Sequence, residues 1–257
     1  MHVANIVTAL VAAVAGLFAG TYATTLIARV PDDASPRPAG RCPECGKRLG
    51  WGEMIPVVSY LTRHGRCAHC DKPYGRRYLV TELVTAVIFG VLGLRFGPSP
   101  DLAAYLYLAF AGIVLSGIDI DCKRLPDVLT KPSYLVVGGL LAIAVPHMPD
   151  GVLRFVYAVI GMVALLALYF VLWLISPRGM AWGDVKLSGS LGLALGWLGM
   201  NGFLIGAFAG FLFGALSGLS MVVLGRLKLK SAIPFGPFMC AGALLGVLLS
   251  DVVRLPF

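Results

Sequence analysis

Residues 3–28 read VANIVTALVAAVAGLFAGTYATTLIA, a run of 26 positions without a charged side chain. A helix rises about 1.5 Å per residue, so this run is long enough to cross the roughly 30 Å of hydrocarbon in a bilayer. No Lys or Arg precedes it, and it is about twice as long as the apolar part of a secretory signal. We therefore predict a retained transmembrane helix.

The rest of the chain has the same character. Of its 257 residues 58% are hydrophobic and 13% are charged, whereas about a quarter are charged in a soluble domain. This composition argues against a soluble globular protein and predicts an all-α polytopic membrane bundle of about eight helices. The expected spans are residues 4–28, 79–97, 101–118, 132–147, 152–175, 187–199, 202–225 and 236–255.

The basic residues indicate how the bundle is oriented. If alternate connections face opposite sides, 18 of the 21 Lys and Arg fall on one side and three on the other. Basic residues are retained on the cytosolic side, so both termini should lie outside and the loop at residues 29–78 in the cytosol. The net charge of +8 then reflects membrane topology, and we expect the lipid bilayer, not nucleic acid, as its partner.

Two cysteine pairs lie in this loop, Cys42-Pro-Glu-Cys45 and Cys67-Ala-His-Cys70, separated by 21 residues. Pairs with this spacing are typical of a tetrahedral zinc site with four thiolate ligands. Two disulfides are the alternative, but stable disulfides are rare in a reducing cytosol. We therefore predict a zinc knuckle with these four ligands.

Four cysteines would leave the metal no open position, so its predicted role is to fold the loop and not to catalyse. His64 and His69 lie nearby and are able to replace a ligand, although a solvated surface position suits both better. Cys122 and Cys240 lie outside the cluster, and we interpret them as small packing residues.

Aspartates mark two predicted helix ends on the cytosolic side. Asp119 and Asp121 end the third span, and Asp184 precedes the sixth. A single aspartate at such a boundary is ordinary, since solvent or a lysine satisfies its charge. Two on the same side suggest a pair that shares a proton, one member activating water and the other polarising a peptide carbonyl. Gly183 would let a substrate backbone approach, and Pro126 would end the local helix.

At these residues the chain resembles the type IV prepilin leader peptidases, a family of membrane aspartyl proteases whose bifunctional members also methylate the new N-terminus. The resemblance runs through Arg29-Val-Pro31, the two cysteine pairs with Ile55-Pro-Val-Val-Ser-Tyr60 between them, Arg77-Tyr78 with Glu82, Asp119 with Leu125-Pro126-Asp127, Gly183-Asp184-Val-Lys-Leu187 and Ile233-Pro-Phe-Gly-Pro-Phe238.

The resemblance implies an inner-membrane endopeptidase with Asp119 and Asp184 as its catalytic pair and Asp121 in a secondary place. Its substrates would be prepilin or pseudopilin precursors with basic leaders, as in type IV pili or type II secretion. Methylation would require S-adenosylmethionine, to which we assign no residues. The implied organisation is a first helix at 1–28, the zinc loop at 29–78 and the peptidase domain at 79–257.

Two positions depart from the family pattern. Ala181 replaces a usual glycine, and one methyl group should be tolerated there. Thr24 stands where bifunctional members commonly have Asn, which weakens the case for methylation. The alternatives are therefore a leader peptidase without methyltransferase activity and, in another class, a transporter or assembly scaffold with interfacial aspartates.

Overall fold

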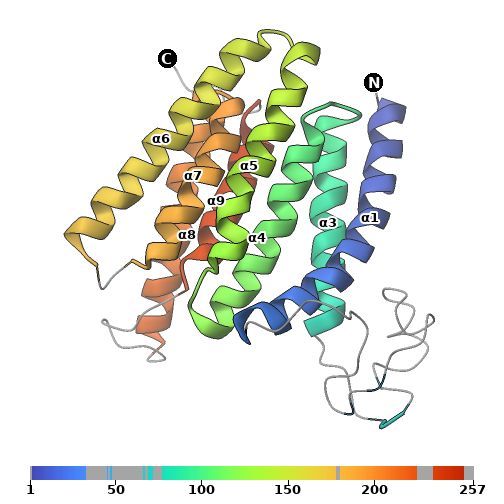
Figure 1. The fold of residues 1–257 in the computed structure, drawn as a ribbon, viewed down its shortest axis with the longest axis vertical. Coiled ribbons are helices and arrows are strands. Elements are labelled where there is room, and N and C mark those ends of the chain that lie inside the picture. Colours follow the sequence, from blue (N-terminus) through green and yellow to red (C-terminus); the bar gives the residue numbers. More distant parts are fainter. Residues whose placement is uncertain are drawn as a thin grey trace. The chain divides into compact units, whose positions relative to one another are not determined.

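The computed structural model describes residues 2–32, 45, 47, 66, 69–71, 77–177, 180–224 and 234–251. All the elements it assigns in these ranges are helices (Figure 1). The chain divides into two compact units, Met1–Leu102 and Ala103–Phe257, and each is described by itself below.

The first unit is a pair of packed helices, α1 (His2–Arg29) and α3 (Arg77–Phe96), with a short 3-10 turn η1 (Val30–Asp32) after α1. Small residues allow the two backbones to approach closely, as is common between membrane helices. A Cβ added to Gly20 would stand 2.6 Å from the Cα of Glu82, and one added to Gly93 would stand 2.8 Å from the Cα of Ala9. The buried Glu82 accepts a 2.7 Å hydrogen bond from the hydroxyl of Thr21.

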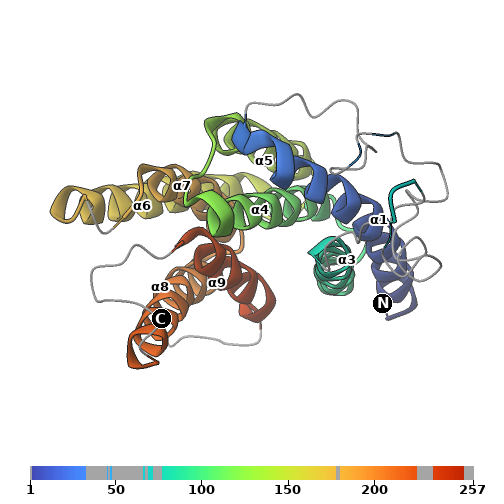
Figure 2. The same cartoon turned by 90° about the horizontal axis from the view of Figure 1, so that it is seen from below.

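The second unit contains six longer helices and the 3-10 turn η3 (Figures 1 and 2). In chain order they are α4 (Leu102–Cys122), α5 (Asp127–Ala144), η3 (Val145–His147), α6 (Gly151–Ile175), α7 (Trp182–Trp197), α8 (Met200–Val223) and α9 (Gly236–Leu249).

Helix α7 is the core of this unit, since α5, α6, α8 and α9 all contact it. From Asp184 to Trp197 every residue is buried except Lys186. Glycine permits its closest contact, because a Cβ on Gly192 would stand 2.4 Å from the carbonyl oxygen of Gly161 on α6. The hydroxyl of Tyr105 on α4 also donates to the carbonyl of Ala194, at 2.9 Å.

Helices α8 and α9 form a second close pair, and they lie side by side in both views (Figures 1 and 2). A Cβ on Gly242 would stand 2.2 Å from the backbone nitrogen of Gly210, and one on Gly246 would stand 2.6 Å from the carbonyl oxygen of Gly202. The two backbones are therefore in direct contact, as in other membrane helix pairs built on small residues.

Each of the eight predicted spans coincides with a helix, and the all-α membrane fold is confirmed. Six helices are long and apolar enough to cross a membrane, namely α1, α3, α4, α5 with η3, α6 and α8. Helices α7 and α9 have 16 and 14 residues, which corresponds to only about 24 and 21 Å of rise. The predicted range for α9 reached residue 255, but the helix ends at Leu249.

The starts of α5 and α7 differ from the prediction by five residues each. We expected α5 from residue 132, but it begins at Asp127, directly after Pro126, and contains Pro132. Pro126 has the extended backbone of an N-cap residue, with φ −67° and ψ 138°. Helix α7 begins at Trp182 and not at residue 187, because its polar first turn is capped by its own aspartate. Apolarity alone therefore placed both starts too late.

Candidate active site

The turn between α4 and α5 carries the first aspartate. Asp119 lies in the last turn of α4, where its backbone carbonyl accepts a 2.8 Å hydrogen bond from the N–H of Lys123. Lys123 has a φ of 52°, in the left-handed region, and this ends the helix. Pro126 then begins α5, as the sequence predicted for a proline that interrupts local helix. The Asp119 side chain is 3% exposed.

The second aspartate lies in the first turn of α7. Its carboxylate Oδ2 accepts a hydrogen bond of 3.2 Å from the backbone N–H of Ala181, the N-cap residue. Asp184 is also 3% exposed, so a short polar turn buries a carboxyl group. Ala181 has a φ of −76°, which suits any residue, and its side chain is exposed. The methyl group at this departure from the family pattern therefore causes no strain.

The start of α9 supplies the hydrogen-bond donor to Asp119. The backbone N–H of Gly236 donates to Oδ2 of Asp119 at 2.9 Å, in a buried setting. A Cβ on Gly236 would stand 3.0 Å from that same oxygen. Glycine thus lets the backbone reach the carboxylate without a side chain in between. The sequence motif that includes Gly236 was noted from the resemblance, but no role was predicted for the residue.

The two aspartates come together, as the sequence predicted. Their carboxyl groups are close enough for their charges to interact. Tyr169 of α6 and Cys240 of α9 share the same environment, since Tyr169 interacts electrostatically with Asp184 and Cys240 with both aspartates. Cys240, which we predicted to be a packing residue, therefore lies beside the aspartate pair and hydrogen-bonds to Ser116.

Aromatic rings extend this environment away from the carboxyl groups. The ring of Tyr169 stacks on Phe211 of α8, with centroids 5.0 Å apart, and lies 6.2 Å from Phe235. Phe235 directly precedes the Gly236 donor and also contacts Phe238 at 6.5 Å. Nothing in the sequence had marked Tyr169, because an aromatic residue in an apolar helix carries no sign of what it faces.

The predicted use of Gly183 is wrong. We expected its missing side chain to leave room for a substrate backbone, but a Cβ there would stand 2.7 Å from the Cβ of Leu125. The chain's own α4–α5 connection therefore occupies that space. Gly183 and Leu125 bring the two aspartate-bearing segments into contact with each other.

The other candidate residues lie apart from this pair. Asp121, Cys122 and His69 are exposed. In the first unit, Thr24 is buried and donates to the carbonyl of Thr21 at 2.7 Å. We therefore see no contact of Asp121 with the aspartate pair that would make it a rival to Asp119.

The predicted zinc site falls largely outside the described residues. Cys42, Cys67 and His64 are not described, whereas Cys45 is exposed and Cys70 is half-buried. Among the residues that the structure does describe, no group of three or more His, Cys, Asp or Glu side chains is arranged to hold a metal ion. The four-cysteine site therefore stays a prediction from sequence spacing.

Two family matches divide the chain. The Bacterial Peptidase A24 N-terminal domain matches residues 14–96, and the Type IV leader peptidase family matches residues 106–219. The second range contains both aspartates of the pair. No solved structure matches the chain.

Characterised relatives agree with both matches, and those described here are named prepilin leader peptidase/N-methyltransferase. One from Burkholderia pseudomallei strain 1026b is 35% identical, over 90% of this chain and 82% of its own length. Another, from strain K96243, is 38% identical over 80% of this chain and 65% of its own length. A third, from Aeromonas hydrophila, is 33% identical over 84% of this chain and 73% of its own length.

Proposed function

The chain belongs to the type IV leader peptidase family, and from this we propose that it is a multi-pass inner-membrane aspartyl endopeptidase. Its substrates are precursors of type IV pilins or pseudopilins, from which it removes the leader. In its second activity it methylates the new N-terminus with S-adenosylmethionine as methyl donor. The relatives' name supports both activities.

We propose Asp119 and Asp184 as the catalytic pair. The observation that carries this proposal is their burial side by side, on α4 and α7, within a chain of this family. A pair that carries one proton can hydrolyse a peptide bond in two proton transfers. The ionised carboxylate takes a proton from water as the water oxygen attacks the carbonyl carbon, and the protonated carboxyl donates to the carbonyl oxygen. Collapse of the tetrahedral intermediate then releases the leader.

One assay of the purified full chain in detergent tests both activities. The chain is incubated with a prepilin-type precursor and labelled S-adenosylmethionine, and mass spectrometry follows leader release and methyl transfer to the product. We expect both. Leader release without methylation would favour a monofunctional peptidase, the alternative that Thr24 motivates. Neither reaction, from a folded chain, would favour the transporter or scaffold.

We further propose that residues 29–78 form a zinc-binding loop with Cys42, Cys45, Cys67 and Cys70 as ligands. We expect about one zinc per chain, because four thiolates complete a tetrahedral site. Metal analysis by mass spectrometry measures it. Cys42→Ser and Cys67→Ser should both lose the metal and reduce methyl transfer more than cleavage.

The matched control for the zinc experiment is Cys122→Ser, since Cys122 is exposed at the end of α4, far along the chain from the two cysteine pairs. It should keep its metal. A wild-type chain that contains no zinc, although purified without chelator, would contradict the proposed site.

We also propose that both aspartates and the cysteine loop face the cytosol, which the distribution of 18 against three basic residues supports. In a variant without native cysteines, single cysteines at Ser35, Ser176 and Ser99 report sidedness by labelling with a membrane-impermeant maleimide. Positions 35 and 176 should react only after permeabilisation, and position 99 in intact cells. Labelling of position 176 from outside would refute this orientation.

A further inference from the structure

A cross-helix ion pair joins the two segments that carry the aspartates. Nζ of Lys186 lies 2.5 Å from Oδ1 of Asp127. Lys186 follows Asp184 by two residues on α7, and Asp127 is the first residue of α5, after the turn that begins at Asp119. The side chains are 24% and 44% exposed, so the pair lies at the edge of the packed unit.

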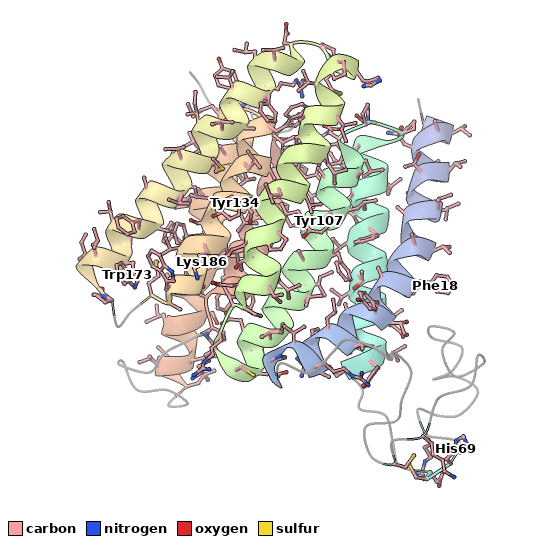
Figure 3. The ribbon with its side chains drawn as sticks, viewed as in Figure 1. Phe18, His69, Tyr107, Tyr134, Trp173 and Lys186 are labelled. Carbon is pink, nitrogen blue, oxygen red and sulfur yellow. The ribbon has the colours of Figure 1, made fainter. Side chains whose placement is uncertain are left out.

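Lys186 is the one residue between Asp184 and Trp197 that is not buried. Its ammonium group lies 6.0 Å from the centroid of the Trp182 ring, in the geometry of a cation–π contact. Its backbone carbonyl accepts a hydrogen bond from the hydroxyl of Tyr134 on α5 (Figure 3). Helix α5 therefore holds this one residue of α7 at two points, through Asp127 at the ammonium group and through Tyr134 at the backbone.

The location of this pair says more than its strength. A half-exposed ion pair contributes only about 0–1 kcal/mol to stability, so a purely stabilising role would be small. The distance between two reacting groups, by contrast, has a large effect on rate, since a misplacement of about 1 Å costs about 100-fold. A link between the α4–α5 turn and the first turn of α7 acts on that distance.

A second lysine bonded to the same carboxylate provides the contrast. Lys131 Nζ lies 2.8 Å from Oδ2 of Asp127, but both residues belong to α5, four positions apart. Its side chain is 68% exposed. Lys131 shares the charge and the partner of Lys186 but connects nothing across helices.

We propose that the Asp127–Lys186 ion pair is a positioning pair, which fixes the first turn of α7 against the α4–α5 turn and so holds Asp184 in register with Asp119. Neither residue touches the reacting atoms. The inference rests on the proposed peptidase function and adds to it the device that aligns the two carboxyl groups.

The test measures kcat and KM for leader release by the purified full chain and its variants. Asp127→Asn and Lys186→Gln should each lower kcat about tenfold, because the aspartates lose their alignment, and leave KM within about twofold. Their combination should be no worse than either alone, since both remove one link. Lys186→Arg, which keeps the charge, should recover most of the rate, and Lys131→Gln should match the wild type.

The charge-reversed variant Asp127→Lys with Lys186→Asp keeps the pair if the single changes fold poorly, and it should be faster than either reversed single variant. Thermal unfolding in detergent measures the folded fraction to which each rate refers. A raised KM with unchanged kcat would overturn the inference in favour of substrate binding, and unchanged kcat per folded chain would overturn it in favour of a structural role. A wild-type chain that releases no leader would overturn the proposed function as well.

Discussion

Replacing either Asp119 or Asp184 by asparagine is expected to abolish leader release, with a loss of at least about 10²–10⁴-fold, the usual contribution of general acid–base catalysis. An amide has nearly the shape of a carboxylic acid but neither accepts the proton of the attacking water nor shares one with its partner. Leader release by the purified variants, followed by mass spectrometry, measures the effect. Both variants should reach the membrane in wild-type amounts, because Asn preserves the volume of the buried side chain.

Asp121→Asn is the matched control, since Asp121 lies two residues from Asp119 but is exposed. It should retain most of the activity. Full processing by either of the first two variants would remove that residue from the catalytic pair. An inactive Asp121→Asn beside an active Asp119→Asn would transfer the role to Asp121.

A substitution at Gly236 is expected to have the second largest effect. Gly236→Val keeps the backbone N–H but places a branched carbon where a Cβ alone would stand 3.0 Å from Oδ2 of Asp119. The carboxylate must move, and we expect kcat to fall about 100-fold, as for other misplacements of about 1 Å. Steady-state kinetics of leader release, normalised to folded protein, measures it.

Gly139→Val is the control for this change, because Gly139 is also helical, is exposed on α5 and has no neighbour within 4 Å of an added Cβ. It carries the same backbone change without the carboxylate contact and should keep its rate. A fully active Gly236→Val would show that Asp119 does not need this donor in place.

Much of the fold could be predicted from the sequence, because uncharged runs of about 20 residues mark membrane helices with little ambiguity. The prediction lost accuracy at α7. Its first turn contains Asp184 and Lys186, so a hydropathy criterion starts the helix after them, yet both are satisfied locally, by the N–H of Ala181 and by Asp127. Polar side chains with partners inside the protein do not end a helix.

The candidate site was predictable to a smaller extent. Asp119 and Asp184 stand out as carboxylates at the ends of apolar runs, and the structure brings them together. The donor at Gly236 is a backbone group, which has no signature in a sequence. The use of Gly183 illustrates the same limit, since a glycine indicates that something approaches closely but not what. Here it is Leu125 of the same chain.

The hydrogen bond from Gly236 to Asp119 also bears on biosynthesis. Its two residues are 117 positions apart, so the ribosome completes both aspartates well before it adds the residue that holds one of them. Until α9 inserts against α8, the nascent chain carries the two carboxyl groups but lacks the N–H that orients Asp119. Protease assembly thus ends with the last helix of the unit, and an unfinished chain in the membrane has no complete means of cutting its neighbours.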